Sequence, residues 1–223
     1  MDIRAGELPK WETKFTEYFL EHGDKSDGSH DLGHFQRVWK AAQYISREEG
    51  DSGDMLVLLA AAYFHDLVSL PKDHPQRRES SRLSAEKTGR LLAGIFPEFP
   101  REKIAGVEHA ILAHSFSAGV AALTPEAKIL QDADRLEAVG AIGVARTFYI
   151  AGLMGAQLFD AADPLAERRE PDDRRYALDH FEVKLLKLPA LMNTVTGRRL
   201  AEKNAEWMRS FVKKMRDEIE GNY

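Results

Sequence analysis

Apolar side chains recur every three to four residues along most of the chain, whereas the alternating runs typical of strands are absent. This period predicts an all-α protein. The first helix carries an apolar stripe formed by Trp11, Phe15, Tyr18 and Phe19. The further helices are predicted over these approximate ranges: 31–49, 54–68, 79–95, 101–113, 127–143, 176–188 and 196–220.

The segment 159–175 has the weakest period and is rich in Asp, Arg and Pro, which predicts a mobile loop or lid. No internal repeat or convincing linker divides the chain. Hydrophobic residues make up 43% of the 223 residues, enough for one sizeable core. We therefore expect a single domain over 1–223, in which the C-terminal helices of 176–220 pack on a core over about 25–150.

The most apolar stretch of the chain, 55–64, has no polar position. A helix there has no solvent-facing side and is expected to run through the core. It ends in His65 and Asp66, two ionisable residues whose burial is costly unless both are satisfied, and a divalent cation would satisfy both. The alternative is a hydrogen bond between the histidine and a carboxylate that closes the helix.

Two more residues extend this candidate metal site. His34 shares a helical stripe with Val38 and Ile45, so its imidazole is expected to point inward. Asp134 lies in the 127–143 pattern, where small residues on the following turns leave space in front of its carboxylate. The alternatives are a hydrogen-bonded core histidine and an aspartate paired with an arginine. The candidate metal ligands are His34, His65, Asp66 and Asp134.

The chain contains no cysteine, which excludes thiolate chemistry, disulfides and cysteine-type zinc sites. Any metal is then held by histidine and carboxylate groups, a donor set that suits Mn, Fe, Co, Ni, Zn or Mg. We expect one divalent ion, with manganese as the first candidate.

The charge pattern disfavours polymeric nucleic acid as a partner, because 31 basic and 36 acidic residues are well mixed and no basic tract is present. The net charge is -5. No apolar signal segment opens the sequence, and no run approaches the roughly 18 apolar residues that cross a bilayer. We expect a cytoplasmic protein without a membrane partner, and a homodimer is left open.

Four motifs carry a family resemblance: His-Asp-Leu-Gly-His-Phe-Gln-Arg-Val (30–38), Phe-His-Asp-Leu-Val-Ser-Leu-Pro-Lys-Asp-His-Pro (64–75), His-Ser-Phe-Ser (114–117) and Gln-Asp-Ala-Asp-Arg-Leu-Glu-Ala-Val-Gly-Ala-Ile-Gly (131–143). Over about 25–150 the chain resembles the HD-domain metal-dependent phosphohydrolases, whose signature is H…HD…D, and in particular their YpgQ/YedJ-like branch. The resemblance implies an orthogonal helical bundle, a metal on the four candidate ligands, and hydrolysis of phosphate esters or anhydrides, generally in nucleotides.

Within this family, the YpgQ/YedJ-like branch implies pyrophosphohydrolysis of (deoxy)nucleoside triphosphates to monophosphate and pyrophosphate. The alternatives are a phosphatase of nucleoside monophosphates and a metal-binding or nucleotide-binding module without turnover.

The sequence leaves two candidates for the aspartate ligand. Asp132 lies about 200° from Asp134 around a helix, so only one of the two can face the metal. The family context favours Asp134.

Residues near these ligands are candidates for phosphate contact and proton transfer. Lys72, His74 and Arg77 lie in the loop after the His-Asp pair, and Arg37 follows His34 by less than one turn. A solvated loop, and a salt bridge from Arg37 to Asp132 or Glu137, are the alternatives.

Asp66 is expected to accept a proton, and His30 or His74 to assist the leaving group. Asp31, beside His30, is equally well explained as a helix cap, for which Ser29 is the other candidate. His109 and His114 resemble the extra histidines that give some HD proteins a second metal. They lie about 140° apart on one helix, however, and converge only if that helix ends before His114. We therefore expect one metal and treat His114 as a substrate contact.

Overall fold

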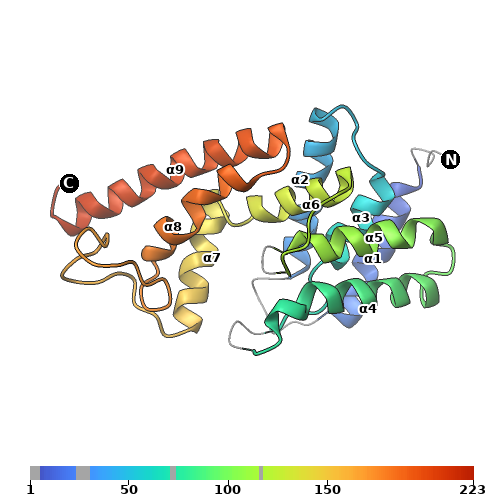
Figure 1. Ribbon diagram of the computed structural model, residues 1–223, viewed down its shortest axis with the longest axis horizontal. Coiled ribbons are helices and arrows are strands. Elements are labelled where there is room, and N and C mark those ends of the chain that lie inside the picture. Colours follow the sequence, from blue (N-terminus) through green and yellow to red (C-terminus); the bar gives the residue numbers. More distant parts are fainter. Residues whose placement is uncertain (1–5, 24–30, 71–73, 116–117) are drawn as a thin grey trace. The chain divides into compact units, whose positions relative to one another are not determined.

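The structure, a computed structural model, describes residues 6–23, 31–70, 74–115 and 118–223. In this part of the chain, α-helices and short 3₁₀ segments are joined by loops, and the only β contact is an isolated bridge between Gln157 and Tyr176. The predicted all-α class is confirmed. The chain forms two compact units, Met1–Asp134 and Arg135–Tyr223 (Figure 1). The single-domain organisation stays a prediction.

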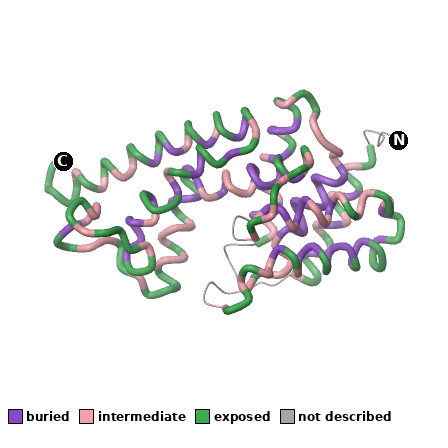
Figure 2. The backbone as a smooth tube through the Cα atoms, in the orientation of Figure 1, coloured by how far each residue is buried: buried purple, intermediate pink, exposed green. Residues whose placement is uncertain are grey.

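The helices of the first unit are α1 (Leu8–His22), α2 (Leu32–Glu48), α3 (Met55–Phe64), α4 (Ser80–Gly94), α5 (Arg101–His114) and α6 (Pro125–Leu136), which runs just past the end of the unit, with the 3₁₀ turn η1 (Arg77–Glu79) before α4. As its composition predicts, α3 is the central element: it packs against α1, α2, α4 and α5. Every residue from Leu56 to Phe64 is buried (Figure 2).

Side-chain caps fix the start of the two helices that lead into the candidate site. Asp54 accepts hydrogen bonds from the backbone N–H groups of Leu56 and Val57 at 2.9 and 3.2 Å, which starts α3. Asp31 accepts from the N–H of His34 at 2.8 Å and starts α2. The capping function that the sequence left open for Asp31 is therefore present, whereas Ser29 lies outside the described residues.

Aromatic packing attaches α1 to the end of α3. The rings of Phe15 and Phe64 meet edge to face with centroids 4.9 Å apart, and Phe19 contacts Phe35 of α2 at 4.8 Å. Trp11 continues the cluster and is 8% exposed. The stripe that predicted the first helix therefore supplies the core that holds α2 and α3 together just before His65.

The second unit contains α7 (Gly140–Leu153), α8 (Asp179–Val183), the 3₁₀ segment η3 (Leu185–Leu191) and α9 (Val195–Ile219). Its core is formed by these buried residues: Val139, Val144, Leu178, Phe181, Leu185, Leu188, Met192, Ala201 and Met208. Two small cavities, of about 170 and 130 Å³, lie in this unit, and none of the predicted site residues lines either.

The single helix predicted over 127–143 is wrong, because the chain leaves the helix after Leu136 and starts α7 at Gly140. Val139 is extended, with φ -122° and ψ 153°, and Gly140 has φ +82°, a conformation that side-chain-bearing residues rarely adopt. A Cβ at this glycine would also lie 3.0 Å from the side chain of Asn204. Apolar periodicity alone does not register such a break.

Two further predictions are corrected by the described residues. The helix predicted over 54–68 ends at Phe64, and the next residues form a turn in which Leu67 N–H donates to the Phe64 carbonyl at 3.2 Å. The helix predicted over 176–188 is reduced to α8, because Lys184 adopts φ -133° and ψ -57°, which interrupts the helical hydrogen bonds before η3.

The segment 159–175 is irregular, as predicted, but its hydrogen bonds argue against the predicted mobile lid. The carboxylate of Asp163 accepts two backbone N–H groups within the segment, at 2.8 and 3.0 Å. Arg169 donates both terminal guanidinium nitrogens to Asp179, which also accepts the N–H of Asp172 at 2.7 Å. These charge-assisted hydrogen bonds tie the segment to itself and to the start of α8.

Among the described residues, no single helix is both long and apolar enough to cross a bilayer, although α6 and α7 taken as a bent pair reach the length and composition required.

Candidate metal centre

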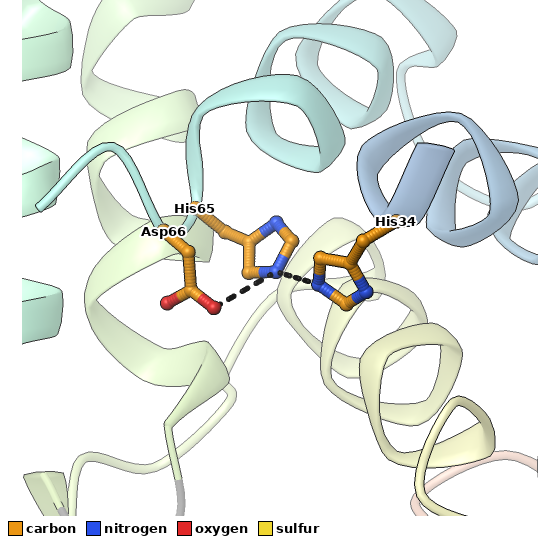
Figure 3. Close-up of side chains that lie close together, drawn as sticks. All are labelled: His34, His65 and Asp66. Carbon is orange, nitrogen blue, oxygen red and sulfur yellow. Dashed lines mark hydrogen bonds and ion pairs between the residues drawn. The ribbon is translucent and has the colours of Figure 1, made fainter. Parts of the chain in front are cut away.

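Helices α2 and α3 bring two imidazoles together, with ring centroids 5.1 Å apart and ring planes tilted by 59°. His34 comes from the first turn of α2, and His65 follows the last residue of α3; their Nε2 atoms lie 3.1 Å apart (Figure 3). Both side chains are fully buried. His34 lies on the same buried stripe as Val38 and Ile45, which confirms that its imidazole points inward.

Two carboxylates approach the same nitrogen atoms. Oδ2 of Asp66 lies 3.6 Å from Nε2 of His65, and Oδ1 of Asp134 lies 3.7 Å from the Nε2 atoms of both His34 and His65. The aspartate side chains are 20% and 28% exposed, whereas the imidazoles are not exposed at all. The cluster is therefore reached by solvent from its carboxylate side.

His114, the last residue of α5, also faces this cluster. Its Nε2 lies 3.5 Å from Oδ1 of Asp66, and its ring meets that of His65 edge to face at 4.9 Å. Two overlapping sets of potential metal ligands result, one formed by His34, His65 and Asp66 and the other by His65, His114 and Asp134. In each set the ligand atoms all lie within 4.8 Å of one another.

The tautomers of two histidines suit metal binding. Nδ1 of His65 lies 2.9 Å from the carbonyl of Ala62, and Nδ1 of His114 lies 2.6 Å from the carbonyl of Ile111. A carbonyl only accepts, so each Nδ1 carries the hydrogen and, in the neutral ring, each Nε2 keeps its lone pair. A backbone acceptor behind a ligating imidazole is the usual way to orient it toward a metal.

The donor spacing also fits one cation. Ligand atoms about 2.1 Å from an ion and at right angles to one another are about 3.0 Å apart, and at tetrahedral angles about 3.4 Å apart. The separation between His34 and His65, those from Asp134 to both histidines and that from Asp66 to His65 range from 3.1 to 3.7 Å, close to these values. Two buried imidazoles and two carboxylates form a donor set that suits a divalent ion.

In the metal-free state a proton takes the place of the cation. Burial alone lowers the pKa of His65, but the charges of Asp66 and Asp134 outweigh it and raise this pKa to about 9. Burial raises the pKa of Asp134, and the imidazole of His65, followed by the charges of His34 and His114, brings it well below its usual range. The metal-free cluster therefore holds a histidinium between carboxylates.

The turn that carries the His-Asp pair is held from α4. Oγ of Ser84, a buried residue, accepts the N–H of Val68 at 3.0 Å and lies 3.2 Å from the Val68 carbonyl, to which it donates. Val68 follows Asp66 by two residues. No motif in the sequence pointed to this serine; its one signal is a small polar residue on a buried helix face.

The remaining predicted residues lie at different distances from the cluster. Asp132 is fully buried and belongs to neither ligand set, and the preference for Asp134 stays a prediction. The guanidinium of Arg37 lies over Gly33, where a Cβ would come within 3.2 Å of Nη1. His109 accepts the N–H of Leu123 at 3.3 Å and does not join His114.

In the loop after the His-Asp pair, the structure describes two of the three candidates. Nη1 of Arg77 donates to the carbonyl of Leu70 at 2.6 Å, so this arginine spans the loop. Nδ1 of His74 accepts the N–H of Gln76 at 3.1 Å. Lys72 and the proposed proton donor His30 lie outside the described residues.

Comparison with known proteins connects this geometry to a family. A family model of the HD domain matches residues 31–139. The uncharacterized protein YpgQ of Bacillus subtilis is 36% identical over 202 residues, which cover 89% of this chain and 88% of YpgQ. The chain belongs to the HD-domain family. The family resemblance of the four motifs, including that to YpgQ, is thereby confirmed.

Solved structures of HD-domain proteins are similar over nearly the whole length. A hydrolase of the HD superfamily from Bacillus thuringiensis matches with a TM-score of 0.69 and 29% identity, covering 95% of this chain and 96% of that one. The crystal structure of Bacillus subtilis YpgQ in complex with ADP matches with a TM-score of 0.66 and 29% identity, covering 95% and 94%. HD-domain membership and the histidine-aspartate groupings together support a metal-dependent hydrolase with a divalent metal site.

Proposed function

We propose that this HD-domain protein is a nucleotide phosphohydrolase that uses one divalent ion, manganese in the first place, to convert a (deoxy)nucleoside triphosphate into its monophosphate and pyrophosphate. The observation that carries the proposal is the convergence of His34, His65, Asp66 and Asp134 within 3.7 Å contacts. The ADP complex of YpgQ supports a nucleotide as the ligand class, because ADP presents a phosphate chain. These four residues would hold the ion.

A divalent ion in such a site neutralises charge on a phosphate oxygen and brings the pKa of a bound water close to neutrality. In the reaction, the oxygen of one water molecule bonds to the α-phosphorus. The bond from that phosphorus to the oxygen that bridges the α- and β-phosphates breaks, and pyrophosphate leaves. The proton of the water needs an acceptor. Asp66 is suited to this role because it is partly exposed and its Oδ1 faces Nε2 of His114.

The other candidates would act on the phosphate chain. Nε2 of His114 would receive the proton from Asp66 as an imidazolium, whose charge then favours the negative charge that develops on the phosphate. Lys72 and Arg77 would hold the β- and γ-phosphates, and Arg37 would approach from α2. His74 or His30 would assist the departing pyrophosphate.

The decisive experiment is a nucleotide panel tested with Mn, Co, Ni and Mg, in which pyrophosphate and orthophosphate are both quantified. Reaction in ¹⁸O-labelled water identifies which phosphorus is attacked, because the label enters the nucleoside monophosphate only if water attacks the α-phosphorus. Asp66→Ala is expected to lose turnover, and His109→Ala, outside the cluster, is the matched control. Orthophosphate released from nucleoside monophosphates would replace the proposal with a phosphomonoesterase, and metal binding without any turnover would replace it with a binding module.

A further inference from the structure

The C-terminal end of α5 is completed by side chains of the candidate site. The last carbonyl groups of a helix have no partner within it and must find one elsewhere if they are buried. His114 donates a hydrogen bond to one of these carbonyls, since its Nδ1 lies 2.6 Å from the carbonyl oxygen of Ile111. Gln131 donates to another: its Nε2 lies 2.8 Å from the carbonyl oxygen of Ala113.

Gln131 connects the two sides of the metal centre. It lies on α6 one turn before Asp134, so its backbone moves with that carboxylate. Its hydrogen-bond partner Ala113 directly precedes His114, whose Nε2 faces Asp66. Gln131 is 7% exposed, and the bond joins positions 18 residues apart. Within the first unit, one buried hydrogen bond thus ties the helix of Asp134 to the end of the helix that presents His114.

The acceptor determines the chemistry of this link. A carbonyl oxygen needs a donor, so the nitrogen of the amide must face Ala113, and neither an apolar nor an anionic side chain can replace it. A serine or threonine at position 131 would be too short to span the same gap. Glutamine therefore supplies both the length and the N–H group that the end of α5 needs.

We propose that Gln131 is a positioning residue, which fixes the imidazole of His114 relative to Asp134 and Asp66. It does so through the backbone of Ala113 and touches neither metal nor substrate. The expected consequence for turnover rests on the proposed function, whereas the consequence for the orientation of His114 does not.

The first test reads His114 directly. In the metal-free protein, long-range ¹H–¹⁵N spectra report the tautomer of each histidine ring, with His114→Ala identifying its signals. Gln131→Met, which keeps the side-chain volume and removes the donor, is expected to shift the His114 signals and lower the fraction of rings with hydrogen on Nδ1. Gln131→Glu is the second variant and is expected to shift them at neutral pH, because its carboxylate opposes the Ala113 carbonyl.

The control removes another hydrogen bond from a buried side chain to a backbone carbonyl in the first unit. Oγ of Ser46 donates to the carbonyl of Ser52 at 2.7 Å, and Ser46 is 1% exposed. Ser46→Ala is expected to reduce thermal stability as Gln131→Met does, while the His114 signals stay at their wild-type positions. His114 signals that do not move in either Gln131 variant would overturn the proposal, whatever the activity of the protein.

The second test is a double-mutant cycle on turnover with the metal-loaded protein. Gln131→Met is expected to lower kcat/KM about tenfold in the wild-type background, the lower end of the effect of losing a group that orients a ligand. In the His114→Ala background the same change is expected to have almost no further effect. Full additivity of the two changes would show that Gln131 acts elsewhere and would overturn the proposal. Absence of all turnover in the wild type would contradict the proposed function and leave the spectroscopic test of Gln131 intact.

Discussion

Nε2 of His34 and Nε2 of His65 lie 3.1 Å apart, although 31 residues separate the two histidines along the chain. The contact exists because Asp31 starts α2 three residues before His34 and α3 ends one residue before His65. Asp134 approaches both ring nitrogens, and Asp66 approaches that of His65. The metal centre therefore depends on where two helices begin and end.

His65→Ala and Asp66→Ala are each expected to abolish stoichiometric metal binding and turnover. Adjacent ligands on one turn cannot both be replaced by water without opening the site to solvent. Metal analysis of the purified, folded variants decides the matter, with His109→Ala as the control that keeps its metal. Full metal content in either ligand variant would refute the proposed ligand set.

Asp134→Asn is expected to weaken metal affinity more than Asp132→Asn. Asp134 approaches both histidines at 3.7 Å, whereas Asp132 is fully buried and outside both ligand sets. The change at Asp132 is therefore expected to lower the free energy of unfolding and leave the metal affinity close to that of the wild type. Titration with Mn²⁺ and urea denaturation measure the two effects separately. The reverse order of affinities would transfer the ligand role to Asp132.

Metal uptake by the metal-free protein is expected to release about one proton at pH 7.5. The pKa of His65 is raised to about 9, so its ring is protonated at that pH and must lose a proton to offer its lone pair. Calorimetry in two buffers of different ionisation enthalpy measures the number released. It is expected to fall toward zero above pH 10, and metal affinity is expected to rise between pH 7 and pH 9.

The same shift gives a stability prediction for the metal-free protein. A histidine whose pKa is raised from 6.5 to about 9 stabilises the folded state fully below pH 6.5, and this contribution is lost as the pH rises through about 9. Asp134 contributes in the opposite direction, since its lowered pKa stabilises the folded state above pH 3.8 and the contribution is lost on acidification. His65→Gln is expected to flatten the alkaline part of the urea-unfolding profile, and an unchanged profile would contradict the raised pKa.

Lys72→Met and Arg77→Met are expected to leave metal content intact and to lower kcat/KM, each by a factor worth about 1.5–3 kcal/mol, the scale of a charge-assisted hydrogen bond. The loss is expected to be larger for a triphosphate than for a monophosphate. Arg77 also donates to the carbonyl of Leu70, so its removal is expected to loosen the loop as well. Exposed Arg78 is the neighbouring control. If both variants keep nearly the wild-type kcat/KM with both substrates, the loop is a solvated surface that does not contact the phosphate chain.

Arg169→Met is expected to destabilise the second unit by about 3–5 kcal/mol, because it leaves the carboxylate of Asp179 without its counter-charge. The side chain of Asp179 is 1% exposed and accepts two guanidinium nitrogens. Lys213→Met breaks the exposed pair with Asp217 and is expected to cost less than about 0.5 kcal/mol. Urea unfolding compares the two, and equal losses would mean that the 159–175 loop is not held by its ion pair.

Local periodicity in the sequence was enough to predict most of the first unit. The apolar run before His65 requires a buried helix, and the stripe of His34, Val38 and Ile45 requires an inward imidazole, since both features depend only on which face of a helix is apolar. The order of histidines and aspartates then matched a known family. These inferences needed no knowledge of which helices are neighbours.

The tertiary structure decided what depends on contacts between helices or on single backbone angles. The approach of His114 to Asp66 and the bond from Gln131 to Ala113 link positions far apart in the sequence, and no helical period encodes such distances. The break at Gly140 requires a positive φ that an apolar pattern cannot reveal. A sequence indicates which side of each helix is buried, whereas the packing of those sides against one another decides which polar atoms meet.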